Sequence, residues 1–284
     1  MRNFDEFTIT DAVIKSFANT RDPRIKQVSE ALVRHLHDFI REIEPTEAEW
    51  AVAINFLTRT GQMCNEVRQE WFLMSDALGV SILVDAINHR LPDKATETTI
   101  LGPFHVDRVA LSPNGATISG PEVGPPLLIE GSVKDIDGRP IIGATVSIWH
   151  CDEDGYYDVQ KNPNALSCRG NVKTDEKGDF WVFGSIPSPY PIQTDGPTGQ
   201  MLEAQGRHPY RPAHVHFRIE ADGFKTLITH LFLAGSAYLD SDVVFAVKDS
   251  LIEELERAAP GISPYGATVA TEIPALRRAF VLAR

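Results

Sequence analysis

The pattern of apolar positions divides the chain into a helical part and a strand-rich part. Between residues 24 and 91, apolar side chains recur every three or four positions, which predicts amphipathic helices. The first such stripe consists of Ile25, Val28, Leu32, Leu36, Phe39 and Ile40. A further helix is expected to begin near Thr46, because Glu49 three residues later completes a capping box.

After residue 99 the apolar residues fall into short alternating runs separated by Gly, Pro and Asp. Alternation with a period of two is typical of strands that bury one face. The runs are residues 128–134, 143–150, 174–183, 213–220 and 227–233. Turn residues such as Asp137 and Gly138 lie between them and favour tight reversals of the chain. This succession predicts an antiparallel β-sandwich.

The spacing G-x-V-x-D-x-x-G-x-P-I-x-G-A-x-V-x-I in residues 131–148 resembles prealbumin-like sandwich modules. The expected fold is therefore mainly β with added α. An N-terminal helical region, residues 1–98, precedes a prealbumin-like β-sandwich domain, residues 99–284. This fold hosts binding and supporting modules as well as enzymes, so it does not by itself indicate a function.

Two stretches of the second domain give other predictions. Residues 184–212 are rich in Pro and Gly and predict a long loop with little regular structure, a kind of segment that is usually functional or disordered. Near the C-terminus, the apolar spacing predicts a helix over residues 247–258, followed by a final strand or extended arm.

The alternation in residues 211–217, R-P-A-H-V-H-F, indicates a candidate metal site. On a strand, His214 and His216 share one face while Val215 and Phe217 share the other. Two neutral imidazoles at this spacing are able to bind one metal ion. An exposed polar face that carries two histidines by chance is the competing interpretation, so other residues must decide.

Composition and charge exclude several classes of partner. The 284 residues carry a formal net charge of −12, which argues against nucleic acid or an anionic membrane as the main partner. No apolar run approaches the roughly 20 residues that a membrane span needs, and the first residues lack the apolar core of a signal peptide. Three cysteines far apart in sequence (Cys64, Cys151 and Cys168) suggest neither a disulfide framework nor a thiolate zinc site. We therefore expect a cytoplasmic protein without membrane insertion.

Tyrosines near the ends of predicted strands change the expected metal. Tyr156 and Tyr157 follow the predicted strand at residues 143–150, and Tyr190 lies in the long loop. A tyrosine at a turn usually packs its ring and donates its hydroxyl to a carbonyl. As a phenolate, however, it is a hard anionic ligand that suits ferric iron, because the cation stabilises the phenolate.

Three motifs together resemble the intradiol ring-cleaving dioxygenases, which are non-haem ferric enzymes. They are W-H-x-x-x-x-G-x-Y from Trp149, P-x-x-Y ending at Tyr190, and G-R-H-x-x-R-P-A-H-V-H-F. The resemblance extends from about residue 24 to residue 251. It implies one Fe(III) per subunit, bound by Tyr157, Tyr190, His214 and His216, with Tyr156 as a neighbour that does not bind iron.

The same resemblance assigns two catalytic residues. Arg211 matches the arginine that offsets negative charge on the substrate and intermediates. Its alternative interpretation is a surface ion pair. Tyr190 is expected to leave the metal when the substrate binds and to accept a proton. The roles of His230, which either lies near the site or packs in the core, and of Cys151 stay open.

Within the family, further segments resemble hydroxyquinol 1,2-dioxygenases rather than catechol enzymes. The stretch L-G-P-F at residues 101–104 and the stretch L-M-S-D-A-L-G at residues 73–79 carry this likeness. It implies a substrate pocket lined by Leu73, Asp76, Ile100, Leu101, Gly102, Pro103, Phe104 and Arg211. Leu73 and Asp76 share one helical face, and Asp76 is expected to face the third hydroxyl group.

The activity implied is O₂-dependent intradiol (ortho) cleavage of hydroxyquinol (benzene-1,2,4-triol) to 3-hydroxy-cis,cis-muconate, the enol form of maleylacetate. A catechol or chlorocatechol 1,2-dioxygenase is the alternative enzyme, and a binding or structural sandwich module without iron is the alternative from another class. The resemblance also implies a homodimer through the N-terminal helices, although packing within one chain would explain their apolar faces equally well. Whether phospholipid is bound between the subunits is left open.

Overall fold

The computed structural model describes residues 2–66, 68–120, 123–162 and 166–284. By compactness the chain divides into two units, Met1–Arg59 and Thr60–Arg284. The boundary falls inside helix α3 (Glu47–Gln62). No helix in the described ranges is both long and apolar enough to cross a bilayer.

The first unit is helical, as the apolar spacing predicts. It contains α1 (Ile9–Ser16), the 3₁₀ turn η1 (Phe17–Asn19), α2 (Pro23–Ile43) and most of α3. The predicted capping box begins α3, because the Thr46 hydroxyl accepts from the Glu49 N–H at 3.2 Å and the Glu49 carboxylate accepts from the Thr46 N–H at 2.8 Å. The helices in this region are therefore confirmed, together with the start of α3.

The apolar stripe of α2 is not covered by the described residues of the first unit. Its predicted members Ile25, Val28, Leu32, Leu36, Phe39 and Ile40 are between 39% and 63% exposed. Helix α1 packs beside α2 through polar contacts, in which Arg41 donates to the Glu6 carbonyl and to the Thr10 hydroxyl, each at 3.0 Å. An amphipathic helix normally buries such a face, so α2 presents a surface suited to a partner.

The second unit begins with α4 (Glu70–Ala77) and α5 (Val80–Asn88). Helix α7 (Pro197–Ala204) packs beside α4, where the buried Glu70 carboxylate accepts from the Thr198 N–H at 2.9 Å. The Pro- and Gly-rich stretch is thus more regular than predicted. Besides α7, it holds the short strands β5 (Tyr190–Pro191) and β6 (Tyr210–Arg211), which pair with each other.

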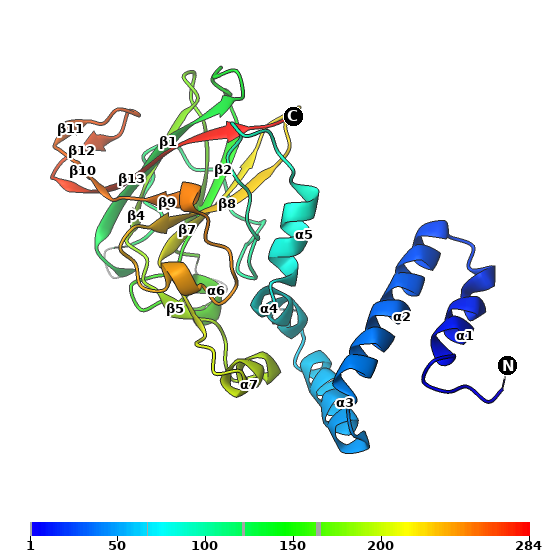
Figure 1. Ribbon diagram of the computed structural model, residues 1–284. Helices are drawn as coiled ribbons and strands as arrows, with labels where there is room; N and C mark the ends of the chain where they lie inside the picture. The colour runs from blue at the N-terminus through cyan, green and yellow to red at the C-terminus, as the bar shows by residue number, and fades with distance from the viewer. Residues whose placement is uncertain (1, 67, 121–122, 163–165) are drawn as a thin grey trace. The chain divides into compact units, whose positions relative to one another are not determined.

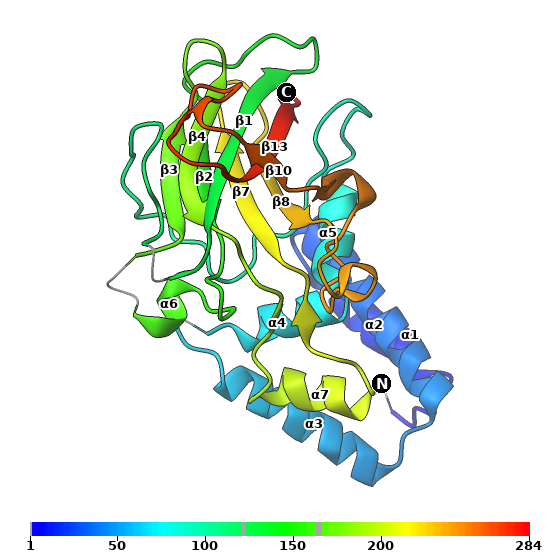
Figure 2. The ribbon, with the colours of Figure 1, turned by 90° about the vertical axis from the view of Figure 1, so that its left-hand side faces the viewer.

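Two sheets make up the body of this unit (Figures 1 and 2). One has the order β10-β13-β1-β4, and the other has the order β3-β2-β7-β8-β9. Their strands are β1 (Pro126–Asp135), β2 (Thr145–Trp149), β3 (Arg169–Lys173), β4 (Asp179–Ser185), β7 (His214–Glu220), β8 (Leu227–Leu233), β9 (Ile252–Glu253), β10 (Glu256–Ala258) and β13 (Ile273–Leu282). The pairs β1–β13 and β8–β9 are parallel and the other pairs in these sheets are antiparallel. A small ribbon, β11 (Gly261–Ile262) with β12 (Thr268–Val269), lies in the C-terminal part.

Aromatic side chains join the two sheets. Phe217 of β7 lies 4.9 Å from Phe280 of β13 and 6.4 Å from Phe180 of β4, measured between ring centroids. Val215 and Ile219 point into the same core. One face of β7 is therefore buried between the sheets, and the alternate side chains point away from the partner sheet. The expected sandwich with N-terminal helices is confirmed.

The helix predicted over residues 247–258 is wrong. This segment holds the 3₁₀ turn η4 (Asp249–Leu251), followed by β9 and β10. Leu251 is buried in the core and Ile252 pairs with Phe232 of β8, so edge pairing with the sheet outweighs the local helical spacing. The final extended strand is confirmed as β13. Another 3₁₀ turn, η3 (Leu239–Ser241), precedes this segment.

Candidate metal centre

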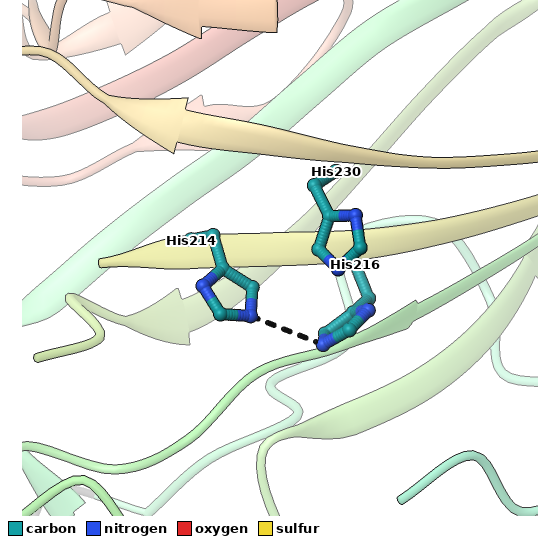
Figure 3. A group of neighbouring side chains, drawn as sticks. All are labelled: His214, His216 and His230. Carbon is teal, nitrogen blue, oxygen red and sulfur yellow. Dashed lines mark hydrogen bonds between the residues drawn. The ribbon is translucent and has the colours of Figure 1, made fainter. Parts of the chain in front are cut away.

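The two histidines of β7 converge on the face that points away from the sandwich core. His214 and His216 are buried, and their Nε2 atoms are 3.2 Å apart (Figure 3). The Pro212 carbonyl lies 2.7 Å from His214 Nδ1, which places the ring proton there and leaves the Nε2 lone pair for a ligand. Burial lowers the pKa of both imidazoles well below 6.5, which favours the neutral form that binds metals.

Two tyrosine hydroxyls from other elements lie close to the histidine Nε2 atoms. Tyr157 immediately precedes α6 (Asp158–Lys161), and Tyr190 begins β5. The Tyr157 hydroxyl is 2.9 Å from His216 Nε2, 3.4 Å from His214 Nε2 and 3.3 Å from the Tyr190 hydroxyl. Both tyrosine side chains are buried, so the packed-ring interpretation holds as well, but their hydroxyls face the histidines.

Local packing holds both tyrosines in place. The Tyr157 N–H donates to the Gln160 side chain at 2.8 Å, and the Tyr157 ring stacks on Phe104 with centroids 4.6 Å apart. Gly155 passes under Tyr190 with a φ of +83°, and a Cβ there would lie 2.7 Å from the Tyr190 Cβ. A residue other than glycine would therefore strain this turn and displace Tyr190.

The spacing of the four donor atoms fits one metal ion. Ligand atoms about 2.0–2.1 Å from an ion are about 2.9 Å apart at a right angle and about 3.4 Å apart at a tetrahedral angle. The three distances from the Tyr157 hydroxyl to the other donor atoms, and the distance between the two Nε2 atoms, fall in this range. Burial, and next the neighbouring Tyr190, raise the pKa of Tyr157 far above 10. A cation at this point would reverse that shift by stabilising the phenolate. Phenolate oxygen and imidazole nitrogen together suit ferric iron.

His230 lies beside His216 on the neighbouring strand β8. It occupies the position on β8 that faces His216 across the ladder, and the two ring centroids are 4.1 Å apart (Figure 3). Its Nδ1 is hydrogen-bonded to the Thr99 hydroxyl. The ligand atoms of His214, His216 and His230 all lie within 4.8 Å of one another. His230, whose role the sequence left open, is therefore part of the buried cluster around the two β7 histidines.

Arg211 is buried beside the cluster and is not a surface residue. It pairs with Tyr190 in the β5–β6 ribbon, and its Nη1 is 3.2 Å from His214 Nε2. Its Nε and Nη2 donate to the two carboxylate oxygens of Asp242 at 3.1 and 3.3 Å. Burial alone would lower the pKa of Arg211, but the Asp242 carboxylate raises it above the ordinary value. A permanent positive charge thus faces the converging hydroxyls.

A pocket opens next to the donor atoms. Seven of the predicted lining residues line it, namely Leu73, Asp76, Ile100, Gly102, Pro103, Phe104 and Arg211, and Tyr190 contributes as well. Leu101, the remaining predicted residue, belongs to the same loop but is not among the lining residues. Gly102 brings this loop against the cluster, because a Cβ there would lie 3.2 Å from His216 Cε1.

Asp76 is the acidic group of this pocket. Its side chain is 7% exposed, and burial raises the pKa of its carboxyl above 3.8, although the nearby Ser81 and Arg211 oppose the shift. Leu73 lies one helical turn away on α4 and supplies apolar surface. The pocket therefore combines a charged guanidinium, a carboxyl group and apolar walls, which suits a small aromatic molecule with several hydroxyl groups.

Five lining residues were not predicted from the sequence, namely Gln160, Pro191, Ile192, Gln193 and Val244. Three of them directly follow Tyr190, so their proximity in sequence to a predicted ligand could have identified them as lining residues. Gln160 lies three residues after Tyr157 and would place its side chain back over the start of α6. Val244 gave no such signal, because it lies far from the other lining residues in sequence, two residues after the Asp242 that pairs with Arg211.

Comparisons with known proteins all find dioxygenases. The family described as "Dioxygenase" matches residues 100–273, and the family described as "Catechol dioxygenase N terminus" matches residues 22–96. A hydroxyquinol 1,2-dioxygenase of Rhizobium sp. (strain MTP-10005) is 48% identical over 257 residues, which cover 89% of this chain and 87% of that protein. A 6-chlorohydroxyquinol 1,2-dioxygenase of Cupriavidus pinatubonensis is 47% identical over 262 residues, 92% of this chain and 95% of that protein.

Solved structures give the same result. A hydroxyquinol 1,2-dioxygenase from Pseudomonas putida DLL-E4 superposes with a TM-score of 0.91 at 44% identity, covering 98% of each chain. A catechol 1,2-dioxygenase from Pseudomonas arvilla C-1 superposes with a TM-score of 0.81 at 29% identity, covering 96% of this chain and 91% of the other.

Proposed function

The chain belongs to the intradiol ring-cleavage dioxygenases, and from this membership we propose that it opens the ring of hydroxyquinol with O₂. The product is 3-hydroxy-cis,cis-muconate, the enol form of maleylacetate. The observation that carries the proposal is the convergence of two phenol and two imidazole donors beside a pocket that contains Asp76 and Arg211. Several relatives named as hydroxyquinol 1,2-dioxygenases are 44–48% identical to this chain, which favours this substrate over catechol.

We propose that Tyr157, Tyr190, His214 and His216 hold one Fe(III) per chain. Ferric iron held by these four residues would supply Lewis-acid chemistry, which withdraws electron density from an aromatic diol bound in the adjacent pocket. The buried, neutral histidines supply ligand atoms without adding charge. The tyrosines supply the negative charge that a ferric ion requires.

Two residues next to the donor atoms handle charge and protons. Arg211 is held by Asp242, and its guanidinium offsets the negative charge of a deprotonated substrate. Tyr190 contacts the pocket as well as the donor cluster, so its oxygen is placed to accept a proton from an entering hydroxyl group. Leu73, Ile100, Gly102, Pro103 and Phe104 are proposed to form the apolar wall, with Asp76 as the partner of the third hydroxyl group.

We propose that residues 1–98 form a linker and dimerisation region and that residues 99–284 form the catalytic domain. The exposed apolar stripe of α2 supports a homodimer through these helices. Light scattering tests this point, and a monomer would contradict it. Phospholipid at the same apolar faces would be detected by mass spectrometry of extracts from the purified protein. A cytoplasmic location is proposed because Cys64, Cys151 and Cys168 are free thiols.

Oxygen uptake with hydroxyquinol, catechol, 4-chlorocatechol and protocatechuate, measured side by side, tests the substrate. The proposal predicts the highest kcat/KM for hydroxyquinol. A higher value for catechol or 4-chlorocatechol would assign the chain to those activities instead. Iron analysis of the purified protein separates all of these from a sandwich module that only binds, since such a module would contain no iron and would consume no oxygen.

A further inference from the structure

Arg169 is a buried cation outside both the donor cluster and the substrate pocket. It begins β3 opposite Trp149 of β2, and its side chain is 3% exposed. A guanidinium is strongly hydrated in the unfolded chain and is rarely enclosed unless several acceptors surround it. The acceptors that surround Arg169 therefore indicate its structural role.

The guanidinium of Arg169 connects two distant chain segments. Its Nε donates to Asp158 Oδ2 at 2.6 Å and its Nη2 donates to Asp158 Oδ1, which makes a two-pronged ion pair. Its Nη1 donates to the Phe104 carbonyl at 3.0 Å. The Asp158 carboxylate also accepts from the N–H groups of Val159 at 2.8 Å and Ser167 at 3.0 Å. The carboxylate is thus fixed from several directions.

Both of these segments meet at Tyr157. Asp158 is the next residue along the chain and begins α6, so the ion pair fixes the backbone that carries the Tyr157 ring. Phe104 stacks on that ring with an interplanar angle of 28°, and Phe104 also lines the substrate pocket. Trp149, which faces Arg169 across the ladder, stacks on His216 with an interplanar angle of 10°.

We propose that Arg169 is a positioning residue that couples the metal-binding Tyr157 to the pocket wall at Phe104. A buried ion pair is weak evidence for stability alone, because its desolvation offsets the attraction between the charges. A planar guanidinium, by contrast, fixes two acceptors at a set angle, which a lysine does not do. Through this fork, the distance between the Tyr157 ring and the Phe104 ring is held constant. The inference rests on the proposed function only where it takes Tyr157 to be a metal ligand.

The decisive variant is Arg169→Lys, which keeps the charge and loses the fork. Its matched control is Arg277→Lys, because Arg277 of β13 also bridges two carboxylates, Glu130 and Glu256, and the Glu130 side chain is fully buried. The control pair lies in the other sheet, away from the donor cluster. The same quantities are measured for both variants. They are the iron bound per chain, the position of the tyrosinate-to-iron absorption band, KM and kcat for hydroxyquinol, and the midpoint of thermal unfolding.

For Arg169→Lys we expect a shifted absorption band and a loss of about 10- to 100-fold in iron affinity or kcat/KM, the range typical of groups that orient metal ligands. The control is expected to keep the band and the kinetic constants of the unchanged protein. An unchanged band, iron affinity and KM in Arg169→Lys would overturn the inference. Equal losses in both variants would also overturn it, since they would indicate general destabilisation.

A paired variant keeps the test decisive if Arg169→Lys does not fold. Arg169→Gln combined with Asp158→Asn removes both charges together and leaves no buried charge unpaired. A shifted band in this folded variant supports the inference, and an unshifted band overturns it. The unchanged protein tests the proposed function separately, because absence of iron colour or of oxygen uptake there would refute the proposed function and not the contacts of Arg169.

Discussion

Replacing Asp76 by alanine is the sharpest test of how the pocket selects its substrate. The carboxyl group lies on the pocket wall in a side chain that is 7% exposed. Hydroxyquinol differs from catechol by one hydroxyl group, which we expect to face Asp76. In Asp76→Ala that hydroxyl group would lie in a buried place with neither a protein partner nor bulk water.

The magnitude follows from this burial. A buried polar group that loses its partner costs about 1–3 kcal/mol, which corresponds to a loss of about 10- to 200-fold in kcat/KM for hydroxyquinol. The carboxyl group also interacts with Arg211, so its removal changes the charge around the active site for every substrate. That second effect acts on catechol and hydroxyquinol alike. It cancels in the ratio of the two kcat/KM values, and this ratio is therefore the quantity to measure.

The assay is oxygen uptake with both substrates, at equal iron content, for the unchanged protein, Asp76→Ala and Leu73→Ala. Leu73 lines the same pocket from the preceding turn of α4 and has no polar group, so its truncation should lower both kcat/KM values by similar factors. An equal loss on both substrates in Asp76→Ala would refute the idea that Asp76 binds the third hydroxyl group.

Three further changes test other parts of the site. Tyr157→Phe should abolish turnover and the purple tyrosinate-to-iron absorption, whereas Tyr156→Phe, at a ring that is 52% exposed, should keep both; an unchanged visible spectrum in Tyr157→Phe would refute its assignment as a ligand. Asp242→Asn leaves the buried charge of Arg211 without its partner, so urea unfolding should show a loss of about 3–5 kcal/mol in the free energy of unfolding, and a loss below about 1 kcal/mol would contradict the pairing. Because burial raises the pKa of Asp76, the folded state keeps this proton to higher pH than the unfolded chain, so the stability that Asp76 contributes is present below pH 3.8 and is lost as the pH rises through its folded pKa. The unfolding midpoint of Asp76→Asn relative to that of the unchanged protein should therefore rise between about pH 4 and about pH 7, and a difference that does not change with pH would contradict this.

The elements that sequence reasoning predicted best are those in which local pattern and tertiary burial agree. In β7, alternation alone placed His214 and His216 on one face and Phe217 in the core, and the structure shows this arrangement. The start of α3 was predictable because its capping box involves residues only three positions apart. Where tertiary pairing overrides local spacing, as in residues 247–258, the pattern misled.

Residues that act through distant contacts were not predictable from one sequence. His230 belongs to the cluster because β8 pairs with β7 in a register that sets it opposite His216, and no spacing rule contains that register. Val244 lies in a segment held by long-range contacts, among them the pairing of Asp242 with Arg211, 31 residues earlier in the chain, and the hydrogen bond from Arg207 to the Val243 carbonyl. Sequence motifs identify the candidate ligands and catalytic side chains. Strand register and long-range hydrogen bonds determine which other residues surround those side chains.

The four donor groups are held in two different ways. The histidines sit on a central strand whose backbone ladder and core packing fix their direction, so few other contacts are needed. The tyrosines come from a short helix start and a two-residue strand, and such elements have little rigidity of their own. Their positions depend on contacts from elsewhere, among them the side chains of Phe104 and Arg169 and the strand pairing of Arg211 with Tyr190. Substitutions of the residues that support the tyrosines should therefore cause small shifts in the absorption band and in substrate preference. Substitutions of the β7 histidines, by contrast, should abolish metal binding.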